Sequence, residues 1–311
     1  MPEPLVSFLL PVYNGAAGLR KSLESLAHQT ERNFEIIAVD DGSSDDSWTI
    51  LQSFPDPRLR AFRRPANRGL ANALNHGMEL ARGRFFARMD QDDISHPQRL
   101  ARQLEHLHAH CDHGLCGAAV QVVSGVSRQG VWRYPRDPEH VRASLMFGSP
   151  CAHPTLLLRR EIFDAGHRYD SEYELAEDWD FLDRVSQKWP ISNLSDRLLD
   201  YRLSPGGTGR ARASQQREAK KKVAARILAR AGIPADENSL QLHLEVTNPR
   251  KRDMDELSRI SKHLCRTWRA ASHQGLVPRF LAWEILWRWM QLCRANGPGA
   301  WKKAVLECPI P

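Results

Sequence analysis

The alternation of short apolar runs with helically spaced leucines over the first 124 residues is the feature that most constrains the fold. Five strands are predicted, at 5–10, 34–39, 58–62, 84–88 and 114–123. The first two are apolar runs bounded by polar loops and are expected to be buried, whereas the signal at 58–62 is weaker. Helical spacing of apolar residues fills the intervals, and Pro97 can open one of these helices. This alternation favours an α/β fold with a mainly parallel sheet covered on both faces.

The pattern changes beyond the fifth strand. Elements become shorter from residue 125 to about 201, with a helix expected around Asp178–Gln187. A stretch rich in glycine and proline at 204–212 then breaks the chain. Three further helices are expected at 215–231, 254–271 and 279–294. We therefore predict an α/β domain at 1–204, with halves at about 1–124 and 125–204, and a helical extension at 205–311.

Charge is distributed unevenly between these two parts. Residues 1–204 contain 24 Lys/Arg and 28 Asp/Glu, whereas residues 205–311 contain 20 Lys/Arg and 9 Asp/Glu. A basic tail of this kind suits contact with phosphate groups, either on an anionic ligand or on lipid headgroups. Nucleic acid has the same chemistry, but we do not expect it as a partner.

Composition also bears on location. No run of 18 apolar residues is present, and the N-terminus lacks the basic and small-residue signals of a secretory leader. Six cysteines occur without a CxxC pair, which fits reduced thiols: Cys111, Cys116, Cys151, Cys265, Cys293 and Cys308. A cytoplasmic protein is expected.

Three polar segments follow the first, second and fourth predicted strands, at 11–14, 40–43 and 90–93. Ligands of open α/β sheets bind beyond the carboxyl ends of the strands, so these segments should converge. In Asp90-Gln91-Asp92 an extended backbone sends both carboxylates to one side, where they can bind a hard cation. The alternative for these residues is a solvated turn. Their position directly after a buried strand favours a metal site.

Asp41 follows the second strand, and we expect it to contact a nucleobase. The competing interpretation of this segment is structural, because Ser44 or Asp45 can cap the helix that contains Trp48.

A third acidic group lies at residues 177–180. A reaction in which an acceptor hydroxyl attacks needs a base to take its proton. The negative charges of Glu177 and Asp180 would raise the pKa of Asp178 and so favour Asp178 in that role. The same residues also suit the acidic first turn of a helix, and the two interpretations are compatible.

Taken in order, these segments resemble the family 2 inverting glycosyltransferases. The resemblance covers about residues 4–203 and rests on six motifs in family order: Pro11-Val-Tyr-Asn14, the run from Gln29 to Glu35, Val39-Asp-Asp-Gly-Ser-Ser-Asp45, Asn67-Arg-Gly-Leu-Ala71, Met89-Asp-Gln-Asp-Asp93 and Ala176-Glu-Asp-Trp-Asp180. Each motif alone is weak, whereas the ordered set is specific.

The resemblance implies a GT-A fold, with a nucleotide-binding half at about 1–124 and an acceptor-binding half at about 125–204. It implies a nucleotide-sugar donor and a glycan or lipid-linked acceptor. The implied donor-binding residues are Pro11, Tyr13, Asp41, Arg68, Gly69 and Asp90. Asp90 and Asp92 match the DxD motif for Mg²⁺ or Mn²⁺, with Asp92 as the leading ligand. Asp178 matches the catalytic base.

One departure from the family's processive members is the absence of a Gln-x-x-Arg-Trp motif, which predicts transfer of one or a few sugars per encounter. Two interpretations of the loop 204–212 stay open. It could close over the diphosphate through glycine N–H groups and Arg210 or Arg212, or serve as a linker. His153 likewise stays open between a structural and a functional role.

The helix at 279–294 is aromatic and basic, with a polar stripe of Glu284, Arg288 and Gln291. It could lie on an anionic membrane surface through residues 279–303, at the cytoplasmic face, or pack on the α/β domain or on a second copy of the chain.

The histidines and cysteines between 106 and 116 invite a zinc interpretation. We set it aside because residues at i, i+2 and i+4 of a helix do not share one face and no CxxC pair is present.

Two other functions were weighed. Sugar nucleotidyltransferases carry a glycine-rich, arginine-containing loop after the first strand, where this chain reads Pro-Val-Tyr-Asn-Gly. A non-catalytic membrane-binding scaffold on a transferase fold is disfavoured because the acidic positions are all filled.

Overall fold

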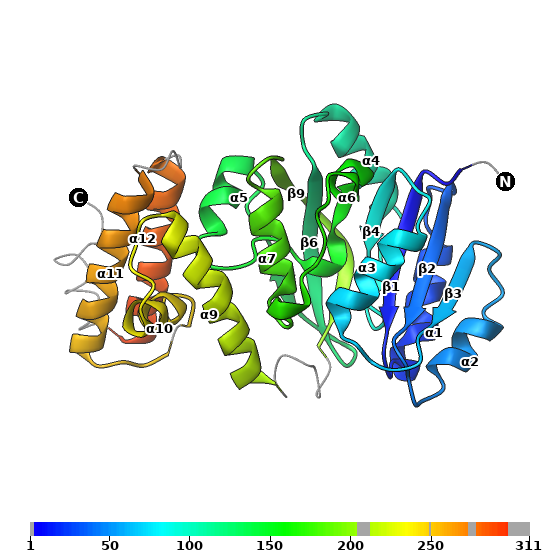
Figure 1. Ribbon diagram of the computed structural model, residues 1–311, viewed down its shortest axis with the longest axis horizontal. Helices are drawn as coiled ribbons and strands as arrows, with labels where there is room; N and C mark the ends of the chain where they lie inside the picture. Colours follow the sequence, from blue (N-terminus) through cyan, green and yellow to red (C-terminus); the bar gives the residue numbers. More distant parts are fainter. Residues whose placement is uncertain (1–2, 204–211, 249, 273–277, 298–311) are drawn as a thin grey trace. The chain divides into compact units, whose positions relative to one another are not determined.

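The computed structural model describes residues 3–203, 212–248, 250–272 and 278–297 (Figure 1). The chain forms two compact units. An α/β unit takes residues 1–137 and 151–212, and a helical unit takes residues 138–150 and 213–311. The predicted boundary at 204 thus moves to 212, and residues 138–150 leave the α/β part because they pack with the C-terminal helices.

The α/β unit is built on one sheet, in the order β3-β2-β1-β4-β8-β6-β9-β5, with β7 paired to β6. β1 pairs in parallel with both β2 and β4, and β6 pairs in parallel with β9, whereas β5, β7 and β8 pair antiparallel to their neighbours. The strands are β1 Val6–Val12, β2 Phe34–Asp40, β3 Leu59–Arg63, β4 Phe85–Arg88, β5 Ile94–Ser95, β6 Leu115–Ser124, β7 Ser127–Trp132, β8 Leu157–Arg159 and β9 Ile191–Arg202.

The five predicted strands match β1, β2, β3, β4 and β6 to within two residues. β1 and β2 are buried along almost their whole length because helices cover both faces of the sheet. The helices of this unit are α1 Ala16–Ala27, α2 Ser47–Ser53, α3 Leu70–Leu80, α4 Arg99–Ala109, α6 Arg160–Asp164 and α7 Glu177–Val185.

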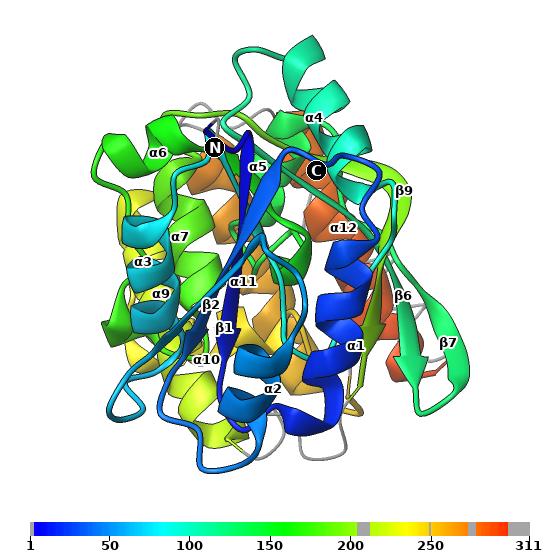
Figure 2. The same ribbon diagram turned by 90° about the vertical axis from the view of Figure 1, so that its right-hand side faces the viewer.

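Alternate residues of β1 face different helices. Phe8 and Leu10 belong to the core cluster that also contains the leucines of α1 and α4. On the other face, Gly77 of α3 lies against Leu9 and the neighbouring strand, close enough that an added Cβ would be 3.4 Å from Leu9. Figure 2 shows α1 and α3 on opposite sides of β1 and β2. The expected covered sheet is confirmed.

The expected cap of α2 was wrong. The helix begins after Asp46, whose side chain makes no capping hydrogen bond. Asp45 instead accepts hydrogen bonds from the backbone N–H groups of Ser47 and Ala16, at 3.0 Å each, and so ties this segment to the start of α1.

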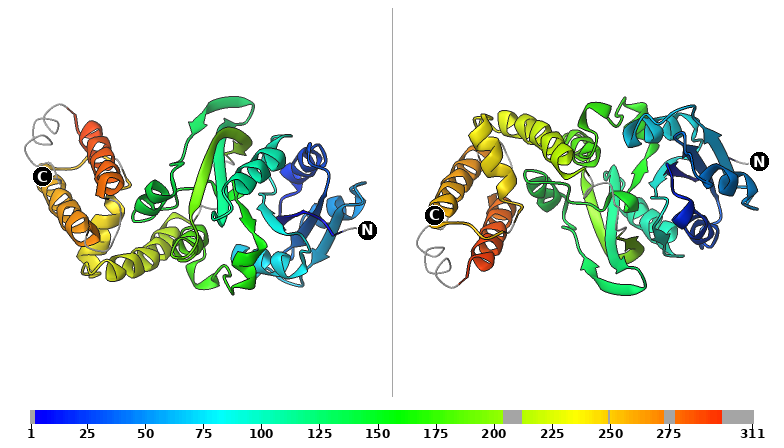
Figure 3. Two further views of the ribbon diagram at one scale, coloured as in Figure 1. Left: turned by 90° about the horizontal axis from the view of Figure 1, so that it is seen from above. Right: turned by 90° about the horizontal axis from the view of Figure 1, so that it is seen from below.

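The helical unit contains α5 Pro138–Ser144, α9 Ala213–Arg230, α10 Glu237–Glu245, α11 Met254–Ser272 and α12 Pro278–Ala295. Three of these are the predicted helices, whereas α5 and α10 were not predicted. Figure 3 shows α11 and α12 side by side in both views. Among the described helices, none combines the length and apolarity needed to cross a membrane.

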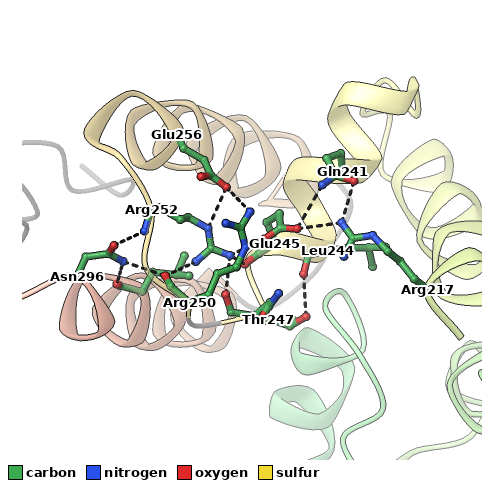
Figure 4. A network of polar contacts seen from close by, with 11 residues as sticks. Arg217, Gln241, Leu244, Glu245, Thr247, Arg250, Arg252, Glu256 and Asn296 are labelled. Atoms are coloured by element: carbon green, nitrogen blue, oxygen red, sulfur yellow. Dashed lines mark hydrogen bonds and ion pairs between the residues drawn. The ribbon is translucent and has the colours of Figure 1, made fainter. Parts of the chain in front are cut away.

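An ionic network holds three helices of this unit together (Figure 4). Glu245, at the end of α10, accepts hydrogen bonds from Arg217 of α9 and from Arg250 and Arg252 ahead of α11. Arg252 is fully buried and also reaches Glu256, while its backbone N–H donates to Asn296 beyond α12. Three arginines of the basic tail are therefore paired within the helical unit.

The polar stripe of α12 faces the interior of the helical unit, and part of its apolar face is exposed. Glu284 is buried and accepts hydrogen bonds from Ser144 and His140 of α5, and Arg288 pairs with it at 3.0 Å. The apolar residues Trp283, Trp287 and Met290 are 39–50% exposed instead. The polar stripe faces inward because α5 supplies its hydrogen-bond partners.

Candidate functional site

The loops that follow β1, β2 and β4 are tied together by side-chain hydrogen bonds to backbone. Gln91 accepts from the Tyr13 N–H at 2.9 Å and donates to the Tyr13 carbonyl at 3.0 Å. The Asn14 N–H donates to Ser43 Oγ at 2.9 Å. The three polar segments therefore converge at the carboxyl ends of the parallel strands.

Asp41 organises the loop that carries Arg68 and Gly69. Its Oδ2 accepts hydrogen bonds from both backbone N–H groups at 2.9 Å, and its Oδ1 lies 3.1 Å from Arg64 Nη1. Gly69 has a φ of 88°, in the left-handed region that favours glycine, so the tight turn into α3 depends on this residue. Three of the predicted donor-binding residues are thus in direct contact.

The remaining predicted donor-binding residues lie beside this loop. Pro11 is in β1, paired with Val39 of β2. Tyr13 follows β1 and is 45% exposed, so its ring is accessible to a flat ligand.

The acid loop, defined as residues 90–93, begins two residues after β4. Asp90 Oδ2 lies 2.5 Å from Nη1 of the buried Arg88, and the Asp90 carbonyl accepts from Ser22 of α1. Asp93 is buried, and its Oδ1 accepts from the Arg202 N–H at 2.9 Å. Burial raises the pKa of Asp93 well above its usual range, and the charges of Asp90 and Asp92 raise it further.

Helix α1 comes very close to the acid loop. A Cβ added to Gly18 would lie 2.9 Å from the Cα of Asp92, and one added to Gly15 would overlap the Gln91 side chain. The absence of side chains at these two positions therefore lets the acid loop pack on the start of α1.

The carboxylates of this loop fit a divalent ion. Asp93 is engaged with β9, which leaves Asp90 and Asp92 as the candidate ligands, and Mg²⁺ typically takes one or two protein carboxylates together with substrate phosphates. Burial is the main cause of the raised pKa of Asp93, and the charges of Asp90 and Asp92 add to it, so a cation bound at these carboxylates would offset part of the shift.

Asp178 lies in the first turn of α7, next to the buried Glu177. Burial and then the charge of Asp178 raise the pKa of Glu177 to about 7. Asp180 was expected to crowd Asp178, but its carboxylate is buried and paired with Arg184 at 2.6 Å. The crowding therefore acts on Glu177, and Asp180 instead has a structural pairing within the helix.

Arg88 links the two acidic groups and was missed by sequence reasoning. Its charge acts on Asp90, Asp93, Glu177 and the hydroxyl of Tyr169. Burial has the largest single effect on the pKa of Arg88 and would lower it, but the charge of Asp90, its hydrogen bond with Arg88, and the nearby Tyr169 and Asp93 together raise it. An arginine that ends a buried strand directly before several aspartates was the available signal.

His153 is close to the same arginine. It is half-buried, its Nε2 is hydrogen-bonded to the Tyr169 hydroxyl at 3.0 Å, and desolvation lowers its pKa well below the usual range. Of the loop 204–212, only Arg212 lies within the described residues, and it pairs with Glu174 at 2.7 Å.

The histidine cluster corrects a further expectation. One nitrogen from each of His106, His110 and His113 lies within 4.8 Å of the others. His106 and His110 are one helical turn apart and share a face, and the loop after α4 brings His113 to them. His108 projects elsewhere, with its ring against Phe85.

Comparison with known proteins matches this architecture. Residues 7–166 match the model of "Glycosyl transferase family 2". An uncharacterised glycosyltransferase of Haemophilus influenzae is 28% identical over 233 residues, which are 71% of this chain and 72% of that protein. The putative glycosyltransferase EpsE of Bacillus subtilis is 31% identical over 163 residues, 51% of this chain and 58% of EpsE.

Solved structures agree in fold. TarS of S. aureus in complex with UDP-GlcNAc has a TM-score of 0.60 at 18% identity, over 96% of this chain and 92% of that one. The mannosyltransferase PcManGT of Pyrobaculum calidifontis with GDP-Man and Mn²⁺ has a TM-score of 0.59 at 16% identity, over 99% and 85%. The predicted GT-A fold is confirmed, and the chain belongs to glycosyl transferase family 2, a family of glycosyltransferases.

Proposed function

We propose that this chain transfers a sugar from a nucleoside diphosphate sugar to an acceptor hydroxyl by single displacement, with inversion at the anomeric carbon. The observation that carries the proposal is the joining of the acid loop to the β1 loop by Gln91. This contact keeps the carboxylates beside the exposed ring of Tyr13 and the loop held by Asp41. A nucleoside could bind beside the Tyr13 ring and the loop held by Asp41, and its diphosphate could bind an ion held by the neighbouring carboxylates.

In this proposal Pro11, Tyr13 and Asp41 line the nucleoside pocket, and Arg68 and Gly69 border the nucleotide. Asp92, with Asp90, would hold Mg²⁺ or Mn²⁺, which would neutralise charge on the leaving nucleoside diphosphate. PcManGT, whose structure contains GDP-Man and Mn²⁺, supports a divalent ion in this fold.

Asp178 is the proposed base that takes the acceptor proton. The buried Glu177 beside it has a pKa of about 7 and responds to the same local charge. Arg88 balances part of the negative charge between the acid loop and α7, and it keeps Asp90 oriented through their contact.

The acceptor is proposed to be a glycan or a lipid-linked glycan of a cell-envelope polysaccharide. The name of the Rhizobium meliloti relative ExoO, "Succinoglycan biosynthesis protein", supports this class; it is 38% identical over 102 residues, 33% of this chain and 29% of ExoO.

We also propose peripheral contact with an anionic membrane through α12. The rings of Trp283 and Trp287 are stacked at 6.1 Å, both are exposed, and the exposed Arg279 and Arg294 flank them. Aromatic rings and arginines together suit the headgroup region. Residues 298–303, also part of the predicted surface, lie outside the described residues.

The catalytic proposal is tested with a panel of nucleoside diphosphates, scored by thermal stabilisation with and without Mn²⁺, followed by turnover of the matching nucleotide sugar. Asp92→Asn should remove the metal-dependent stabilisation, and Asp178→Asn should abolish turnover while donor binding persists. Asp196→Asn, on the exposed part of β9, is the matched control and should retain both. Undiminished turnover in both site variants would refute the mechanism.

The membrane proposal is tested by vesicle sedimentation. Anionic vesicles should bind the wild-type chain and neutral vesicles should not. Trp283→Ala with Trp287→Ala should lose binding, whereas Trp132→Ala, at the equally exposed tryptophan of β7, should keep it. Equal binding by all three proteins would exclude α12 as the contact.

A further inference from the structure

The three histidines of the cluster come from the end of α4 and the loop that leads into β6. His106 is in the last turn of α4, His110 caps it, and His113 is two residues before β6. The rings of His106 and His110 are 4.4 Å apart between centroids, and those of His110 and His113 are 4.7 Å apart. The three rings are therefore packed against one another.

Each imidazole is oriented by one hydrogen bond. His106 Nε2 and His113 Nδ1 are both hydrogen-bonded to Ser192 Oγ, at 2.7 and 3.0 Å, and His110 Nδ1 to the His106 carbonyl at 2.9 Å. For the second nitrogen of each ring, the described part of the chain offers no hydrogen-bond partner. Metal-binding histidines commonly use one nitrogen for the metal and the other for a hydrogen bond that fixes the ring.

We propose that His106, His110 and His113 form a binding site for a divalent transition-metal ion of the zinc type. Three imidazoles suit Zn²⁺, Ni²⁺ or Cu²⁺, whereas Mg²⁺ and Mn²⁺ prefer carboxylates. Tetrahedral ligation at 2.0–2.1 Å brings nitrogens to about 3.4 Å apart, so nitrogens at the 4.8 Å limit must approach by about 1.4 Å. His110 is exposed and can make this movement. Water takes the fourth position.

This site is separate from the acid loop. β4 pairs antiparallel with β8, and β8 pairs antiparallel with β6, so β4 and β6 run in the same direction. The acid loop follows the carboxyl end of β4, whereas His113 precedes the amino end of β6. The two sites therefore lie at opposite ends of the strands. An ion bound by the histidines would join α4 to the loop entering β6 and would not take part in sugar transfer.

The test uses the full chain and Zn²⁺ or Co²⁺ as the probe. One Zn²⁺ per chain is expected by calorimetry, together with a raised thermal midpoint and the visible absorption of tetrahedral Co²⁺. His110→Gln alters an exposed residue and should preserve the fold while weakening Zn²⁺ binding at least tenfold. Ser192→Ala should weaken binding by about 10–100-fold, the usual effect of losing a residue that orients ligands.

His108→Gln is the matched control, because His108 is on the same helix, exposed, and outside the cluster. Its Zn²⁺ affinity should equal that of the wild type, as should the affinity of Asp92→Asn. If Zn²⁺ does not bind, or binds equally well to His110→Gln, the proposal is overturned. Loss of Zn²⁺ binding in Asp92→Asn would transfer the metal to the acid loop and overturn it as well.

Discussion

The ion pair between Arg88 and Asp90 should be worth a measurable part of the stability of the α/β unit. Arg88 is 3% exposed at its side chain and Asp90 is 29% exposed, and their nearest atoms are 2.5 Å apart. Removal of one partner from a buried pair costs about 3–5 kcal/mol, because the other charge stays buried without compensation. Arg88→Met approaches this range, since the carboxyls of Asp93 and Glu177 also interact with Arg88.

Asp90→Asn should cost less, about 2 kcal/mol, because the partly exposed carboxylate is already screened by solvent. The double variant removes both charges, so its loss should be smaller than the sum of the single losses. A coupling free energy of about 1–2 kcal/mol is expected for neighbours in one network.

The assay is urea unfolding without metal, followed by tryptophan fluorescence, on the wild type, both single variants and the double variant. Trp179 is buried in α7 and reports on the α/β unit. Arg160 and Asp164 form a more exposed pair on α6, 3.5 Å apart, and provide the control cycle, with a coupling of about 0–0.5 kcal/mol. A coupling below about 0.5 kcal/mol at Arg88 and Asp90 would refute the reasoning.

Three further predictions concern the site. Because the folded-state pKa of Glu177 is about 7, the stability of the wild type should fall as pH rises from 4.5 to 7. Glu177→Gln should remove up to about 3 kcal/mol of this fall, and thermal midpoints at pH 5 and 8 would measure it. Gly18→Ala places a Cβ 2.9 Å from the Asp92 Cα and should weaken Mn²⁺-dependent nucleotide binding about tenfold by calorimetry, whereas Gly130→Ala, which meets open space, should not. Gln91→Ala removes two hydrogen bonds to Tyr13 and should raise the donor KM about fivefold with little change in kcat, checked by initial rates.

The parallel part of the fold could be predicted because its strands are buried on both faces. Because such a strand is buried on both faces, most of its consecutive residues are apolar, as in Phe34–Asp40. The intervening helices have leucines at helical spacing. The convergence of the loops after β1, β2 and β4 followed from topology alone. Their contacts through Gln91 and Asn14 confirm that convergence.

Elements stabilised by distant partners could not be predicted in the same way. β9 alternates between buried and exposed segments, so no single periodicity describes it. The inward orientation of Glu284 depends on His140, 144 residues away in the sequence. The histidine cluster depends on a loop that brings His113 back to α4, which helical spacing does not reveal.

The acidic site is best understood through its balance of charge. Three aspartates of the acid loop and the pair Glu177 and Asp178 are opposed chiefly by Arg88 among the groups that act on them. Of these five carboxyls, Asp93 and Glu177 are the buried ones, and burial together with the neighbouring negative charges raises the pKa of both. A bound cation would supply the missing positive charge, and both carboxyls should then release protons more readily. Binding of Mn²⁺ with nucleotide should therefore release protons near pH 7, and calorimetry in buffers of different ionisation enthalpy would detect it. Glu177→Gln should reduce that release, whereas an unchanged release would place its source elsewhere.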